Sequence, residues 1–202
     1  MGGNANIGNY IAKTGAFAGG NGPGTDTYKF WSQSYDKGAD TGGGSDMDFY
    51  LTYTGKPIVA TYKRDQAANA ANNEFGWTDF TNLYPIFTGQ HTAGEQVTFT
   101  PTDEYAFYFI GVGGLTFWTQ SDNFGDDRDN QHFAFFREAD NTYWVGMEDA
   151  PFYYPDGRVR SDRDYNDMIV RLAPIPEPAT MLLLGSGLIG LAGYGRKKFF
   201  KK

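Results

Sequence analysis

The strongest constraint on the fold is a period-two alternation of apolar and polar residues that recurs along the chain. Val97 and Phe99 alternate with threonines, Phe133 and Phe135 form a similar run, and residues 47–53 repeat the pattern. Successive side chains of a β-strand point to opposite faces, so this period is typical of strands. The alternation therefore predicts an all-β domain.

A second apolar pattern indicates how the strands are layered. Residues 105–112 are apolar on both faces, as expected for a central strand of a sandwich, and Gly, Asn and Asp clusters separate the runs. We predict an antiparallel, jelly-roll-like β-sandwich over residues 26–173. Residues 1–25, rich in Gly and Asn, are expected to form a flexible lead-in. Residues 66–73 fit either two helical turns or a loop.

The chain ends in an uncharged apolar run, residues 179–195, followed by five cations in residues 196–202. At 1.5 Å of rise per residue, the run would make a helix of about 26 Å, close to the thickness of a thin hydrocarbon core. We predict a C-terminal transmembrane helix with the basic tail in the cytoplasm. The alternative is a buried core helix, but a core helix usually keeps a polar stripe and this run has none.

Pro176, Glu177 and Pro178 precede this run, and the combination with the basic end resembles the PEP-CTERM sorting signal of Gram-negative bacteria that make exopolysaccharide. The resemblance covers residues 174–202. It implies an exported protein that an exosortase cleaves near the box, held in the inner membrane before processing and located at the cell surface or in the matrix afterwards. Residues 1–10 lack the basic and apolar regions of an export signal, so the expected signal is not seen there.

The domain ahead of this tail is strongly acidic. Without the five cations of residues 196–202, the formal charge changes from −7 to −12. Such a domain repels nucleic acid and attracts multivalent cations. Because the chain has no cysteine, a disulfide framework and a thiolate metal site are both excluded.

The densest chemistry lies in residues 161–168, where Asp162, Asp164 and Asn166 follow the spacing of a calcium loop. The segment is not an EF-hand, because Asp167 stands where that loop needs Gly and Ala173 stands where it needs a bidentate carboxylate. Further oxygen ligands must therefore come from elsewhere.

Those further ligands are expected just after a neighbouring strand. Residues 142–147 and 164–172 both show strand patterns, and antiparallel pairing would bring the acids after the first strand to the start of the second. We predict a calcium site at Glu148, Asp149, Asp162, Asp164, Asn166 and Asp167. The alternative is a network in which Arg160 and Arg163 neutralise the carboxylates.

A second resemblance covers about residues 70–172. Residues 74–79, 99–101, 131–135, 146–149 and 162–168, with the DRDYND sequence as the most specific piece, resemble a bacterial extracellular domain of unknown function, the family numbered 4114. The resemblance implies a β-rich secreted domain without assigned catalysis.

These features predict a non-catalytic structural or adhesive component of the envelope or polysaccharide matrix, whose partners are exosortase and extracellular polysaccharide or envelope components. The chain has two histidines and no recognisable nucleophile or metalloprotease motif. One alternative is a carbohydrate-binding module, since four Trp and 14 Tyr could stack on sugars. A less favoured one is a glycoside hydrolase that uses a carboxylate pair.

Overall fold

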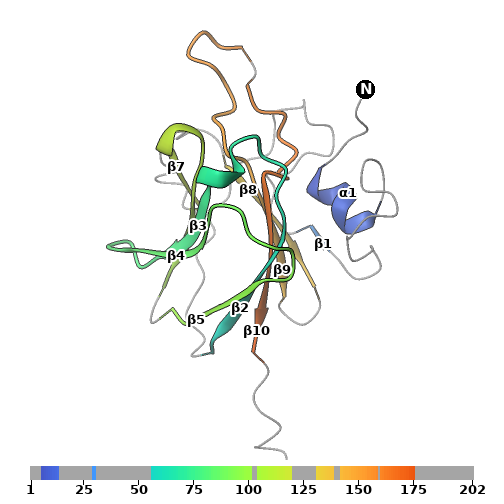
Figure 1. Cartoon of the computed structure of the whole chain (residues 1–202), viewed down its shortest axis with the longest axis vertical. Helices are drawn as coiled ribbons and strands as arrows, with labels where there is room; N and C mark the ends of the chain where they lie inside the picture. Colours follow the sequence, from blue (N-terminus) through green and yellow to red (C-terminus); the bar gives the residue numbers. More distant parts are fainter. Residues whose placement is uncertain are drawn as a thin grey trace, which may run out of the picture.

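Two antiparallel β-sheets packed face to face form the body of the protein (Figure 1). A computed structural model of the chain describes residues 6–13, 29–30, 56–101, 104–119, 131–138, 142–158 and 160–175. The strands are β1 (Lys29–Phe30), β2 (Ile58–Arg64), β3 (Glu74–Thr78), β4 (Leu83–Thr88), β5 (Gln96–Phe99), β6 (Ala106–Ile110), β7 (Thr116–Trp118), β8 (Phe133–Arg137), β9 (Tyr143–Met147) and β10 (Met168–Pro174). The helical elements are α1 (Ile7–Ala12) and the short 3-10 turns η2 (Ala70–Asn72) and η3 (Val112–Gly114).

The larger sheet has the strand order β1-β8-β9-β10-β2-β5, and the smaller has the order β4-β3-β6-β7. Strands β9 and β10 pair in antiparallel register, with Met168 opposite Met147 and Ile169 opposite Gly146. This register places the residues that follow β9 beside those that precede β10.

Strand alternation divides the buried side chains between two clusters. Val145 and Met147 of β9 and Phe107 of β6 belong to the core between the sheets. Trp144, one residue away from Val145, points to the opposite face of the larger sheet and belongs to a second cluster. Because successive side chains change face, one period-two sequence can supply both clusters.

Helix α1 covers that second face of the larger sheet (Figure 1). Ile7, Tyr10 and Ile11 are 2% exposed or less and pack with Trp144. The side chain of Asn6 caps the helix by accepting from the Asn9 amide at 2.8 Å. Within the expected flexible lead-in, residues 7–12 are thus a docked helix, because apolar residues at i, i+3 and i+4 fall on one helical face.

Most strand predictions are confirmed, and the antiparallel two-sheet arrangement is that of a sandwich. Strands β5, β6, β8 and β9 lie where the sequence patterns indicated them. β10, however, begins at Met168 rather than at residue 164, because residues 161–167 turn around a buried carboxylate. Residues 66–73 form a loop that contains η2. The predicted strand at 47–53 lies outside the described residues, and the jelly-roll assignment and the domain boundaries stay predictions.

The predicted transmembrane helix, residues 179–195, also lies outside the described residues. Within the part of the chain that the structure describes, no helix is both long enough and apolar enough to cross a membrane. The C-terminal helix therefore stays a prediction from the sequence.

Docking of α1 can be tested with Ile7→Ala. Ile7 is fully buried, so the substitution should lower the free energy of unfolding by about 2–4 kcal/mol through lost burial and a residual cavity. The exposed Lys13→Gln, at the end of the same helix, should change it by less than about 0.5 kcal/mol. Urea unfolding followed by tryptophan fluorescence measures both, and equal stabilities of the two variants would show that α1 does not belong to the cooperative domain.

Candidate metal centre

The candidate site lies at one end of the β9–β10 pair. Glu148 and Asp149 follow the last residue of β9, and residues 161–167 lead into β10. The amide of Asp167 donates to the carbonyl of Met147 at 3.1 Å, which continues the ladder by one step. The predicted meeting of the two acidic segments is confirmed by this pairing.

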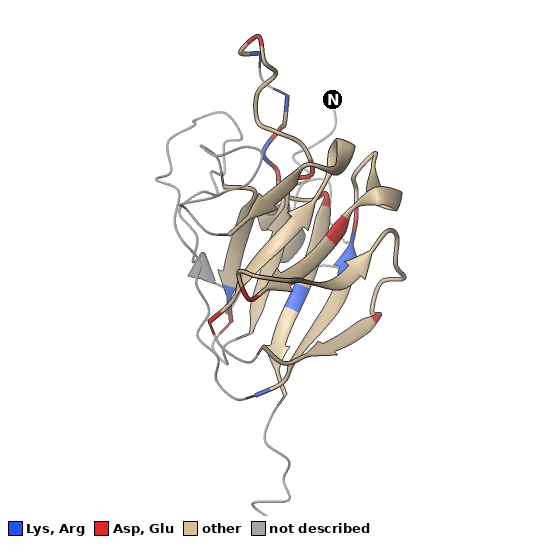
Figure 2. Cartoon of the chain, turned by 90° about the vertical axis from the view of Figure 1, so that its left-hand side faces the viewer, with Lys and Arg blue, Asp and Glu red and all other residues tan. Residues whose placement is uncertain are grey.

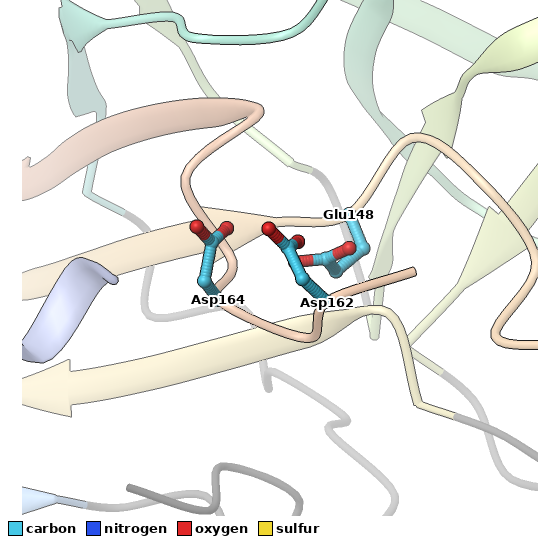
Figure 3. A group of neighbouring side chains, drawn as sticks. All are labelled: Glu148, Asp162 and Asp164. Carbon is cyan, nitrogen blue, oxygen red and sulfur yellow. The ribbon is translucent and has the colours of Figure 1, made fainter. Parts of the chain in front are cut away.

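Three carboxylates converge in this site (Figure 3). One oxygen from each of Glu148, Asp162 and Asp164 lies within 4.8 Å of the other two. Their environments differ, because Glu148 is 1% exposed, Asp164 is half-buried and Asp162 is exposed. The acidic group is therefore buried on the side of Glu148 and open to solvent on the side of Asp162.

The turn before β10 wraps around the Glu148 carboxylate. The Tyr165 amide donates to Glu148 Oε1 at 2.5 Å, and the Ser161 hydroxyl donates to Glu148 Oε2. Arg163 and Tyr165 both have left-handed backbone conformations, with φ of 54° and 52°. Non-glycine residues seldom adopt this conformation, and such strain often marks functional segments. Here it bends the chain so that the Tyr165 amide faces Glu148.

A second carboxylate pair lies next to the first group. The Asp149 amide donates to Asp167 Oδ2 at 2.9 Å, and the Asn73 side chain donates to Asp149 Oδ2 at 3.2 Å. Asn166 braces the first group, since its amide nitrogen donates to Asp164 Oδ2 at 2.5 Å. Of the six predicted ligands, the structure therefore brings three together and places Asp149, Asn166 and Asp167 beside them.

Burial and mutual repulsion favour protonation of these acids. Burial, followed by the charges of Asp167 and Asp164, raises the pKa of Glu148 well above its ordinary value. Burial, with the neighbouring Asp162 charge second, raises the pKa of Asp164 to about 7. The pKa of Asp167 is raised to about 8 by burial and then by Asp149. A cation or bound protons must offset this repulsion.

The two arginines that could have neutralised the cluster are directed to aromatic rings. The Arg163 guanidinium lies 4.5 Å from the centroid of Phe152 and donates to the Tyr153 hydroxyl at 2.6 Å. The Arg160 guanidinium lies 5.4 Å from the centroid of Tyr154. Among the described residues, neither arginine forms an ion pair with a carboxylate. The alternative prediction, in which Arg160 and Arg163 neutralise the acids, therefore finds no support in these contacts.

The donor set fits a hard divalent cation. All three convergent groups offer carboxylate oxygens, the ligands that calcium, magnesium and manganese prefer, whereas zinc favours nitrogen and sulfur. Calcium accepts six to eight oxygens and tolerates irregular geometry, so backbone carbonyls and water can complete its shell around three carboxylates.

Three residues of the site were not among the predicted ligands. Ser161 holds Glu148, Asn73 holds Asp149, and His132 Nδ1 lies 3.2 Å from the Glu148 carbonyl oxygen. Ser161 precedes Asp162 in the acidic segment, so its position in the site could have been predicted from the sequence. Asn73, which is 76 residues away from Asp149, carries no local signal of the contact.

Comparison with known families identifies a PEP-CTERM protein-sorting motif at residues 174–197. The match confirms the sorting-signal part of the sequence interpretation and implies an exported exosortase substrate. It does not extend to residues 70–172, so the resemblance to the family numbered 4114 stays a prediction. Comparisons with curated proteins and with solved structures give no significant match.

The raised carboxyl pKa values predict how stability depends on pH without metal. Asp164 and Asp167 titrate near 7 and 8 in the folded protein but about 4 when unfolded, so the folded state holds more protons between these values. In chelator, the melting temperature should therefore fall as pH rises from about 4 to about 8 and level off above.

Asp164→Asn should make the melting temperature depend less on pH, because an asparagine side chain does not ionise in this range. Asp156→Asn, at an exposed carboxylate, serves as the control and should keep the full pH dependence. Differential scanning calorimetry from pH 4 to 9 measures all three proteins. A melting temperature that rises across this range in the unmodified chain would contradict the raised pKa values of Asp164 and Asp167.

Proposed function

We propose that the chain is an exported, exosortase-processed component of the cell envelope or exopolysaccharide matrix, structural or adhesive and non-catalytic, whose β-sandwich is stabilised by calcium. The observation that carries the metal assignment is the convergence of Glu148, Asp162 and Asp164, to which no arginine of the described residues is paired. The sorting motif at residues 174–197 supports export and processing.

Calcium in this site would act as a structural clamp. It would join the end of β9 to the turn before β10, two segments separated by residues 150–160. Binding would replace the protons and the repulsion of the free carboxylates, and binding to the folded state alone raises stability by mass action. The clamp explains why a domain without disulfides would concentrate acids at one end of its central strands.

A tryptophan-based sugar site has less support. Trp77 is 8% exposed and Trp144 is 3% exposed, so these two rings belong to the buried clusters. Trp77 stacks on Tyr84 at 4.1 Å between ring centroids, so part of its surface is already covered. Trp118 is half-buried, and the side chain of Trp31 lies outside the described residues.

Thermal melts test the metal. At a calcium concentration about 100 times the dissociation constant, the ion should add about 2.7 kcal/mol to stability and raise the melting temperature relative to chelator. Asp162→Asn should remove most of this gain, because Asp162 is the exposed member of the triad, so that its loss should affect the cation more than the folded core.

Glu95→Gln, which changes an exposed carboxylate on a surface turn, is the matched control and should keep the full calcium shift. Magnesium in place of calcium tests selectivity, since it demands a stricter octahedral shell and should stabilise less. Superimposable melts of the unmodified chain in calcium and in chelator would rule out the clamp.

Processing is tested by changing the predicted cleavage box. With a co-expressed exosortase and an export signal fused to the N-terminus, the otherwise unmodified chain should lose its C-terminal tag, whereas Glu177→Ala should retain the tag and stay with the membrane fraction. Thr180→Ser, a conservative change just beyond the box, should be processed normally. Loss of the tag from the Glu177→Ala chain at the normal rate would show that this residue is not part of the recognised signal.

A further inference from the structure

A hairpin stands out from the sandwich between β9 and the acidic turn (Figure 1). It comprises residues 152–158 and Arg160, joined by bonds from the Arg160 amide to the Phe152 carbonyl and from the Tyr154 amide to the Arg158 carbonyl, each 2.8 Å. Gly157, with φ of 82°, makes the tight turn at its tip. Figure 2 shows this loop extending beyond both sheets with basic positions along it.

Arginines and exposed tyrosines stack on one another along this hairpin. The guanidinium groups of Arg158 and Arg160 lie 5.1 Å and 5.4 Å from the centroid of Tyr154, which is 41% exposed. At the base, the Arg163 guanidinium lies 5.2 Å from the centroid of Tyr153, which is 44% exposed. Stacking on rings fixes the guanidinium planes and leaves N–H donors at their edges.

The hairpin carries positive charge that its own acids do not cancel. Asp156 pairs with Arg158 at 2.8 Å, but Arg160 and Arg163 make no ion pair with any residue that the structure describes. The whole chain has a formal charge of −7, so a polyanion is repelled by most of the molecule. Within the part of the chain that the structure describes, the hairpin is therefore a place where an anionic ligand would be accepted.

The hairpin is also anchored rigidly at its base. Phe152 is 4% exposed and packs with Tyr165 and His132 in the cluster beneath the acidic turn. A fixed base and stacked arginines reduce the conformational entropy that binding must remove. The two arms of the hairpin thus present a row of donors and aromatic rings.

We propose that this arginine–tyrosine hairpin binds a carboxylate-bearing polysaccharide. Guanidinium edges match carboxylates in bidentate geometry, and the exposed parts of Tyr153 and Tyr154 that the arginines leave uncovered offer apolar surface against which sugar rings pack. An acidic polypeptide would use the arginines but not the ring surface that Tyr153 and Tyr154, 44% and 41% exposed, still present to solvent. This inference rests on the proposed function in one respect, the adhesive role of the protein, and it assigns that role to the hairpin surface.

The test uses the full-length chain in a mild detergent and measures binding to immobilised hyaluronan by biolayer interferometry. Dextran serves as the neutral polysaccharide and poly-L-glutamate as the carboxylate polypeptide. Binding to hyaluronan should exceed binding to both and should weaken with salt. The double variant Arg158→Gln, Arg160→Gln should bind hyaluronan at least about tenfold more weakly.

Arg137→Gln is the matched control, because the Arg137 guanidinium also stacks on a tyrosine, 5.9 Å from the centroid of Tyr143, but lies on β8 away from the hairpin. It should change binding by less than about twofold. Absence of hyaluronan binding, equal binding by the double variant, or tighter binding to poly-L-glutamate would each overturn the proposal. A calcium shift in the melts of the same preparation shows that such a failure concerns the hairpin and not the metal clamp.

Discussion

Burial of the Glu148 carboxylate is the interaction on which the arrangement of this end of the molecule depends. The turn before β10 folds around it through Ser161 and Tyr165. The same turn holds α1, because the Asp164 carbonyl accepts from the Ile7 amide at 2.9 Å. A buried charge is tolerated only with a partner or as a neutral acid. The turn thus links the buried Glu148 carboxylate to the helix docked beside it.

The second sheet reaches this region as well. The Val112 amide of η3 donates to the Asp149 carbonyl at 2.7 Å, and a Cβ on Gly111 would collide with that carbonyl oxygen. Glycine is thus required where the connection from β6 to β7 passes over the end of β9. Both sheets and α1 converge on residues 148–167, and a cation there would stabilise contacts among elements that are distant in sequence.

Strands were predictable where alternate side chains point to the same face of a sheet. In β8, for example, Phe133 and Phe135 both enter the core between the sheets. Helix α1 was missed because a glycine-rich composition masked a short apolar spacing at residues 7, 10 and 11. The acidic centre was predicted from local spacing plus one strand pairing. The division of the acidic centre into a triad and a separate Asp149–Asp167 pair was not predicted. This division depends on the left-handed backbone at Arg163 and Tyr165 and on Asn73 from a distant loop.

The boundary between the folded body and the sorting motif follows from backbone chemistry. The last ladder bond described runs from the Ile175 amide to the Pro57 carbonyl at 3.0 Å. Pro176 and Pro178 have no amide hydrogen, so neither can donate a further bond to a neighbouring strand. The sorting motif begins at Pro174, the last residue of β10. The last ladder donor described, Ile175, is therefore the second residue of the motif, and removal of the chain beyond Pro178 would break no bond of the ladder described here.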